Sequence, residues 1–204
     1  MSNSPELVFS LLAIAFTVVG IHLWRYRRKR KRLMQQFAKS QGVSFKPELI
    51  QPLEQTLEAC FTLPYTGLVR SFAQFSNLIN AGEIQLFQCV ELLDLNPHAH
   101  SESTHFSRIA ALYKVDQSEQ CFFIYYPSGT HAPRLAQQWQ PSQSILEKIE
   151  KPIKTAAIRH PLSITINNGM MLIYFEPLIT GGESAEDIKA LYQTAKRLHQ
   201  VLTH

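Results

Sequence analysis

The sequence predicts an α+β protein, in which an N-terminal transmembrane helix precedes a small domain whose antiparallel, hairpin-built sheet is covered by helices. A long apolar stretch begins the chain, strand-like runs separated by turn residues fill its middle, and an amphipathic helical pattern ends it. No strand–helix–strand alternation is evident, which argues against a doubly wound parallel sheet. The 204 residues are 45% hydrophobic and 18% charged, which is typical of a folded protein and excludes a mainly disordered one.

The first element is the apolar stretch from Leu7 to Trp24, eighteen residues without Asp, Glu, Lys or Arg. A helix of this length spans roughly 27 Å, enough to cross the hydrocarbon core of a bilayer. A cleavable signal peptide would carry basic residues before the stretch, whereas the only charged side chain there is Glu6. A core helix of a soluble domain is the other alternative, but the basic residues that follow make it difficult to bury. We therefore interpret the stretch as a membrane anchor.

A basic run directly follows the anchor, and no Lys or Arg precedes it. We expect the following residues at the membrane interface: Trp24, Arg25, Arg27, Arg28, Lys29, Arg30, Lys31 and Arg32. The positive-inside rule then places the N-terminus outside and the domain in the cytoplasm. The run could instead bind nucleic acid or one particular lipid head group, but its position favours a topology determinant that also attracts anionic lipid. After this run 13 basic residues stand against 15 acidic ones, so we expect no nucleic-acid partner.

We divide the chain into an anchor with its basic run, residues 1–32, and a cytoplasmic α+β domain, residues 33–204. Apolar residues within Leu33–Gln41 fall on one helical face, and Gly42 is a natural residue to end a helix. The anchor helix is therefore expected to continue past the lipid as one rod that ends near Gly42. A second, short helix is predicted over Glu48–Cys60.

The middle of the domain is predicted to consist of strands. Two strand-like runs lie within Leu68–Leu93, with a turn at Asn80–Gly82. Further strands are predicted over Ile109–Val115 and Cys121–Tyr126. Because only a short polar connection, which includes Asp116–Glu119, joins these two strands, we expect them to pair as an antiparallel hairpin. A short helix is predicted over Ser142–Lys151.

The clearest local signal is a hairpin near the C-terminus. Ser163–Asn167 and Met170–Phe175 flank Asn168-Gly169, and both central residues of a type I′ turn need a positive φ, which Asn and Gly tolerate. Ser184 then precedes a helical pattern, with Asp187 three residues on as its capping-box partner. The apolar residues of that pattern predict an amphipathic C-terminal helix that covers one face of the sheet.

Four short segments carry a resemblance: GVSF at Gly42–Phe45, FTLP at Phe61–Pro64, NAGEIQLF at Asn80–Phe87 and NNGMMLIYF at Asn167–Phe175. With the apolar start and the basic run, they resemble a scattered group of uncharacterised bacterial single-pass membrane-anchored proteins of unknown function. The soluble part of those proteins has the same order of hairpins, helix, hairpin and final helix. The resemblance covers most of the chain, and with it we assign the protein to the bacterial inner membrane. It implies no activity.

One polar stretch carries the residues of a candidate metal site. His98, His100 and His105 stand near Asp94 and Glu102, and imidazoles and carboxylates at short spacing can hold zinc or another divalent ion. The spacing fits no recognised closed site, so a solvated His-rich loop is the alternative. We expect no cofactor, since neither GxxxxGK[ST] nor GxGxxG occurs in the chain.

No catalytic residue is assigned, and we expect the protein not to be an enzyme. Ser128 and His131 are close in sequence but lack the strand–GxSxG–helix context of an activated serine. The three cysteines, Cys60, Cys89 and Cys121, form no CxxC pair and are expected to be reduced. Because Cys89 and Cys121 lie in apolar strands, we expect them in the core.

The aromatic strand that follows Cys121 offers a candidate partner surface. Side chains alternate between the two faces of a strand, so one aromatic face is exposed unless a helix covers it. We take Phe123 and Tyr125 as candidates for that surface.

The predicted function is a single-pass membrane protein that presents its domain for protein–protein interaction, as an accessory or assembly subunit of a membrane complex. Its expected partners are the lipid bilayer and a membrane-associated protein. The alternatives are a membrane-tethered sensor of a small ligand or lipid and, less favoured, a metal-dependent enzyme.

Overall fold

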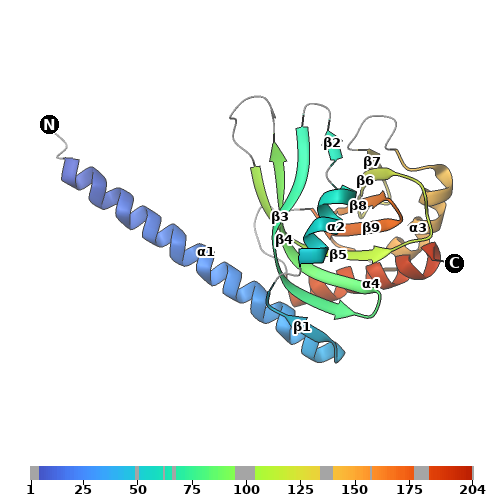
Figure 1. Ribbon diagram of the computed structural model, residues 1–204, viewed down its shortest axis with the longest axis horizontal. Helices are drawn as coiled ribbons and strands as arrows, with labels where there is room; N and C mark the ends of the chain where they lie inside the picture. The colour runs from blue at the N-terminus through green and yellow to red at the C-terminus, as the bar shows by residue number, and fades with distance from the viewer. Residues whose placement is uncertain are drawn as a thin grey trace.

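A computed structural model describes residues 5–48, 51–61, 63–65, 68–94, 104–133, 140–156, 158–176 and 184–203. The elements, labelled in Figure 1, are α1 (Pro5–Gln41), β1 (Ser44–Lys46), α2 (Gln51–Phe61), β2 (Leu63–Tyr65), β3 (Leu68–Ala81), β4 (Ile84–Asp94), β5 (Thr104–Lys114), β6 (Cys121–Tyr125), β7 (His131–Pro133), α3 (Gln143–Ala156), β8 (Leu162–Asn167), β9 (Met170–Phe175) and α4 (Ala185–Leu202).

Helix α1 is a single uninterrupted helix of 37 residues. Its N-terminal half projects away from the rest of the molecule, and its C-terminal end lies against the domain (Figure 1). The helix ends at Gln41 because Gly42 adopts a positive φ of 65°, which a residue without Cβ does readily. The amide of Val43 then donates to the carbonyl oxygen of Ala38 at 3.0 Å. The expected rod that ends near Gly42 is confirmed.

The nine described strands form one sheet in which every pair is antiparallel. Their order is β1-β3-β4-β5-β9-β8-β6-β7, and β2 pairs with the first residues of β3. The predicted α+β architecture is confirmed. The β8–β9 hairpin is also confirmed, and Asn168 and Gly169 have φ angles of 50° and 69°, as a type I′ turn requires.

The predicted pairing of β5 with β6 is wrong. β5 pairs with β4 and β9, whereas β6 pairs with β8 and β7, so the β8–β9 hairpin lies between the two strands. Their six-residue connection passes over the turn of that hairpin, where the Val115 amide donates to the carbonyl oxygen of Gly169 at 2.9 Å. An extended connection of this length reaches roughly 20 Å, enough to cross two intervening strands.

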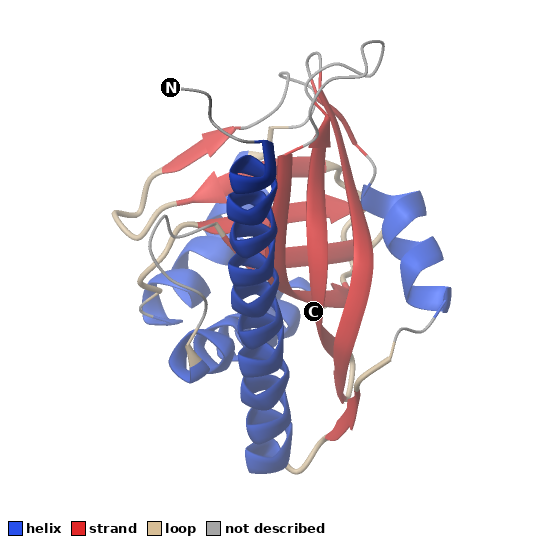
Figure 2. Cartoon of the chain, turned by 90° about the vertical axis from the view of Figure 1, so that its left-hand side faces the viewer, coloured by secondary structure: helices blue, strands red, loops and turns tan. Residues whose placement is uncertain are grey.

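Helices cover both faces of the sheet (Figure 2). α3, α4 and the end of α1 contribute to the core on one face, and α2 contributes to the core on the other. The strands alternate between the two cores: in β9, Met171 and Ile173 join the first, whereas Leu172 and Tyr174 join the second. Burial on both faces explains why β6 and β9 are apolar throughout, since each fully buried large apolar side chain contributes about 1.5–3 kcal/mol.

Candidate functional site

The N-terminal half of α1 exposes an apolar surface. The exposed fractions of Phe9, Phe16 and Trp24 are 71%, 74% and 57%. An 18-residue window of this helix has a mean hydropathy of 1.8, and none of the window is buried in the protein. By length and composition the helix can cross a membrane. An exposed apolar surface of this extent is unfavourable in water and is stabilised by contact with an apolar environment.

Six of the seven basic residues that follow are exposed: Arg25, Arg27, Arg28, Lys29, Lys31 and Arg32. Carbon Cζ of Arg28 lies 5.0 Å from the centre of the Trp24 ring, so the two side chains stack one helical turn apart. Arg30 is different, because only 2% of it is exposed. Its position on the helix turns Arg30 toward the sheet, so its side chain is not exposed as that of the other predicted interface residues is. The depth of Arg30 relative to a membrane stays a prediction.

Arg30 joins α1 to the sheet. Its Nη1 donates to Oγ of Ser107 in β5, and its Nη2 donates to the Ser107 carbonyl oxygen at 3.3 Å. Gln88 of β4 donates to the same Oγ at 3.4 Å, and Asn77 of β3 donates to Oε1 of Gln88 at 2.9 Å. The guanidinium carbon also lies 4.8 Å from the centre of the Tyr26 ring. A buried cation therefore connects α1 to a polar network across three neighbouring strands.

Apolar contacts continue this attachment along α1. Met34, Phe37 and Ala38 are 0%, 6% and 2% exposed. The Phe37 ring packs edge-on against Tyr192 of α4, with ring centres 5.5 Å apart. Packing of α1 on the domain thus begins at Arg30, inside the segment predicted as anchor, so α1 belongs to both parts of the molecule.

A second buried polar cluster lies on the face of the sheet that α2 covers in part. Arg108 of β5 donates from Nε and Nη2 to Oε2 of Glu91 in β4, at 3.0 and 2.7 Å. The Tyr174 hydroxyl donates to Oε1 of Glu91 at 2.6 Å, and Glu176 lies 4.0 Å from Nη2 of Arg108. The side chains of Arg108 and Glu91 are 3% and 0% exposed. This ion pair fixes the register between β4 and β5, because a shift of one residue would leave each buried charge without its partner.

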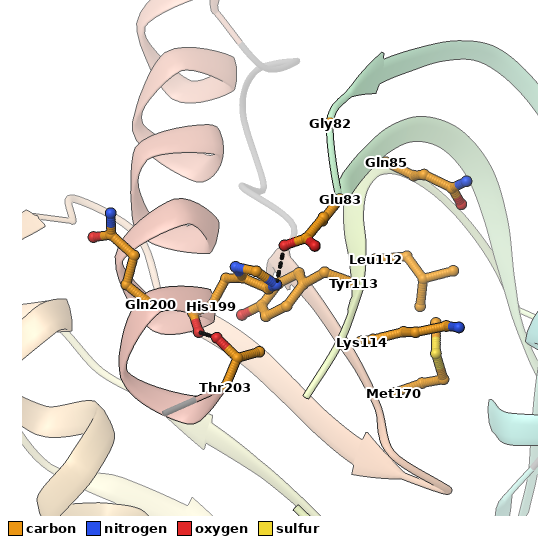
Figure 3. A pocket seen from close by; sticks show the side chains of 10 residues that line it. All are labelled: Gly82, Glu83, Gln85, Leu112, Tyr113, Lys114, Met170, His199, Gln200 and Thr203. Atoms are coloured by element: carbon orange, nitrogen blue, oxygen red, sulfur yellow. Dashed lines mark hydrogen bonds and ion pairs between the residues drawn. The ribbon is translucent and has the colours of Figure 1, made fainter. Parts of the chain in front are cut away.

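An open groove of about 840 Å³ lies between the β3–β4 turn and the end of α4. Its lining residues are Gly82, Glu83, Gln85, Leu112, Tyr113, Lys114, Met170, His199, Gln200 and Thr203. In Figure 3, Glu83 reaches from the turn to His199 of α4, and Oε2 lies 3.0 Å from Nε2. The His199 ring packs edge-on against Tyr113, with ring centres 5.7 Å apart. The groove combines apolar walls with ionisable and amide groups, as small-ligand sites do.

The described part of the chain does not test the candidate metal site. His98 and His100 lie outside the described residues. His105 occupies a backbone position in β5 opposite Leu92 of β4, but its side chain is not among those described. Within the described part, no group of three or more His, Cys, Asp or Glu is placed to hold a metal ion. The metal site stays a prediction.

The expected core positions of Cys89 and Cys121 are confirmed, since both are 0% exposed, and all three cysteines are free. Burial, with a further contribution from the Glu119 charge, raises the pKa of the Cys121 thiol to about 12. Burial also raises the pKa of Cys60. Thiols with raised pKa values are poor nucleophiles at neutral pH, because little thiolate is present.

The prediction of an exposed aromatic partner surface is wrong. Phe123 and Tyr125 are 0% and 3% exposed, and they share a core with Ile149 and Ile153 of α3. β6 is an inner strand between β8 and β7, and helices cover the face that carries these two rings. Aromatic density in this strand therefore reflects core packing.

Two features of the site region were not predicted from the sequence. The Glu91–Arg108 pair had a signal, because each charged residue has apolar neighbours on at least one side in its strand, and unpaired charges are rarely buried. The groove had none, because Glu83 and His199 are 116 positions apart and only the packing of α4 brings them together. Comparisons with protein-family models, with curated proteins and with solved structures find no match.

Proposed function

We propose that this chain is a single-pass membrane protein whose α1 helix holds an α+β domain at the cytoplasmic face of the membrane for interaction with a membrane-associated protein. In this proposal it is a non-enzymatic accessory or assembly subunit of a membrane complex in the bacterial inner membrane. The observation that carries the proposal is the continuity of α1 from its exposed apolar half to its buried end.

The continuity of α1 bears on function because it leaves no flexible linker between anchor and domain. Arg30 follows Trp24 by six residues, which is about 9 Å along a helix. The domain would therefore lie against the headgroup layer and keep one orientation relative to the bilayer. A fixed distance from the membrane and a fixed orientation favour docking onto another membrane protein. A tethered enzyme that acts on a soluble substrate does not require them.

The orientation in this proposal follows from charge. Six exposed basic residues stand directly after the apolar half of α1, and no Lys or Arg of the sequence stands before it. Lys and Arg close to a membrane-spanning helix are retained on the cytoplasmic side, so the domain belongs there.

The groove beside Glu83 and His199 favours a second candidate function, a membrane-tethered sensor of a small ligand. Its volume of about 840 Å³ falls in the range of small-molecule sites, and its lining mixes apolar and polar groups. In a sensor, ligand binding would act on the contact between the β3–β4 turn and α4, which the Glu83–His199 pair makes at 3.0 Å.

Labelling of single cysteines in intact cells tests the topology. In a Cys60→Ser background, Ser2→Cys is expected to react with a membrane-impermeant maleimide from outside. Ser128→Cys, an exposed position of the domain, is expected to react only after the membrane is permeabilised. The reverse pattern, or reaction of both cysteines in intact cells, would refute the proposed orientation.

Isolation of the full chain at native expression level, in mild detergent, tests the interaction function. A protein that co-purifies in fixed stoichiometry is expected. It should be lost when a Gly-Ser-Gly segment is inserted after Arg28, which keeps the anchor and the domain but breaks the rigid connection. A solitary monomer in native membranes would contradict the interaction function and leave the sensor as the better account.

A further inference from the structure

We infer that the face of α1 turned away from the domain holds an anionic phospholipid headgroup, bound by Arg25, Arg28 and Arg32 beside Trp24. The inference rests on the proposed membrane anchor. It goes further by assigning a ligand site to three of the seven basic residues.

The helix separates these three arginines from Arg30. Residues spaced three and four apart share one helical face, so Arg25, Arg28 and Arg32 form one row. Arg30 lies two positions from both Arg28 and Arg32, which at about 100° per residue turns it to the opposite side. The structure agrees, because the three arginines are exposed whereas Arg30 is buried against Ser107. The row therefore faces outward while the domain occupies the other side.

Among the described residues, no carboxylate serves as a counterion for this row. No acidic residue occurs between Glu6 and Glu48, so α1 offers no carboxylate near the three guanidinium groups. Within the part of the chain that the structure describes, Arg25, Arg28 and Arg32 make no ion pair. Three adjacent cations repel one another and gain from an external anion.

The position of the three arginines relative to the bilayer indicates that the anion is a lipid headgroup. Trp24 ends the apolar stretch, and tryptophan prefers the headgroup level of a bilayer. Its ring stacks on Arg28 at 5.0 Å and so holds one guanidinium at that level. The row extends over about 10 Å of helix, comparable to the depth of a headgroup layer. Guanidinium groups bind phosphate in a bidentate manner, and a row of three cations favours a headgroup of net negative charge over one that carries its own cation. The fitting ligand is therefore the phosphodiester of an anionic lipid.

Quenching of Trp24 fluorescence by brominated lipids measures this binding. The probe is the full chain with Trp139→Phe, which leaves Trp24 as its only tryptophan. It is reconstituted in phosphatidylcholine vesicles that contain increasing fractions of brominated phosphatidylglycerol or, separately, brominated phosphatidylcholine. We expect the anionic lipid to bind beside Trp24 about fivefold more strongly than the zwitterionic one, the factor that corresponds to about 1 kcal/mol for one basic residue at an anionic surface.

Two matched triple variants distinguish binding by Arg25, Arg28 and Arg32 from a general effect of positive charge. Arg25→Gln, Arg28→Gln and Arg32→Gln combined are expected to abolish the preference. The control combines Lys39→Gln, Lys46→Gln and Lys148→Gln, which removes the same charge from exposed positions beyond the headgroup layer, and is expected to keep the preference.

The outcomes distinguish the inference from the proposal beneath it. Equal quenching by the two lipids, or a preference unchanged in the triple arginine variant, overturns the headgroup site while leaving the anchor in place. Absence of quenching by either lipid overturns the membrane anchor as well. Loss of the preference in an excess of inorganic phosphate would show a site for free phosphate and would also overturn the inference.

Discussion

Arg30 of α1 and Ser107 of β5 are joined by two hydrogen bonds, one to the serine hydroxyl and one to its backbone carbonyl. Because of these bonds, Arg30 is buried against the domain, unlike the other six basic residues of the run. The remaining six stay exposed. The same short segment therefore fixes the domain to the helix on one side and offers positive charge on the others.

Replacing Arg30 with Gln is expected to lower the free energy of unfolding of the domain by about 2 kcal/mol, because hydrogen bonds from charged donors contribute roughly 1.5–3 kcal/mol. Chemical denaturation of the full chain in detergent micelles measures this. Lys31→Gln, at the exposed next position, is the control and should change the unfolding free energy by less than about 0.5 kcal/mol. Equal midpoints for the two variants would show that Arg30 does not attach α1 to the sheet.

Replacing Arg108 with Met is expected to destabilise the domain by about 3–5 kcal/mol, because Glu91 would keep a buried charge without its cation. The double variant Arg108→Met with Glu91→Leu should recover most of that loss, since a well-packed apolar pair often replaces a buried ion pair without penalty. Thermal unfolding followed by circular dichroism compares the three proteins. Additive losses in the double variant would contradict a direct interaction of the two residues.

Ser163→Ala is expected to leave the domain as stable as before or to stabilise it by up to about 1 kcal/mol. The Ser163 hydroxyl is buried and has no hydrogen-bond partner among the described residues, so removing it relieves a desolvation penalty. Thr165 faces the same side of β8 and is 0% exposed, and its interactions make Thr165→Ala the contrasting variant, with an expected loss of about 1 kcal/mol or more. A greater loss for Ser163→Ala than for Thr165→Ala would refute this account.

Stability is expected to fall as the pH rises above the ordinary thiol pKa of 9.0, because burial raises the pKa of Cys121 to about 12 in the folded protein. In that window the unfolded chain loses the thiol proton and the native chain keeps it, so the unfolded state binds fewer protons. The loss should reach about 2 kcal/mol near pH ~10.5. Burial raises the pKa of Tyr113 as well, which adds to the fall at higher pH.

Denaturation at neutral and alkaline pH measures this loss, with Cys121→Ala as the comparison. The variant is expected to lose less stability than the natural chain between the two conditions, whatever its stability at neutral pH. An identical pH dependence in both proteins would show that the Cys121 thiol does not contribute.

The sequence predicts well those features that depend on neighbouring residues. Asn168-Gly169 fixes the last hairpin through backbone conformation, and the Ser184–Asp187 capping box forms as predicted. The end of α1 at Gly42 follows from the same kind of local rule. Such features need no information about distant parts of the chain.

Features that depend on long-range packing are the ones that the sequence misplaces. β5 and β6 are close in sequence, but pairing is decided by the hairpin that inserts between them. An aromatic side chain suits both a core and a partner surface, so the sequence alone does not distinguish the two for Phe123 and Tyr125. The placement of the helices shows that both are buried. Arg30 looks like its basic neighbours until the position of the sheet shows that this turn of the helix faces Ser107.

The central claim is that α1 runs from the membrane into the domain core as one rigid element. Pulsed electron paramagnetic resonance between spin labels at Phe16→Cys, in the apolar half, and Lys189→Cys, on α4, tests it in bilayer nanodiscs. Cys60→Ser removes the one partly exposed thiol, and Cys89 and Cys121 are buried. A single narrow distance distribution is the predicted result. A broad distribution would contradict the claim, because it would show that anchor and domain move independently.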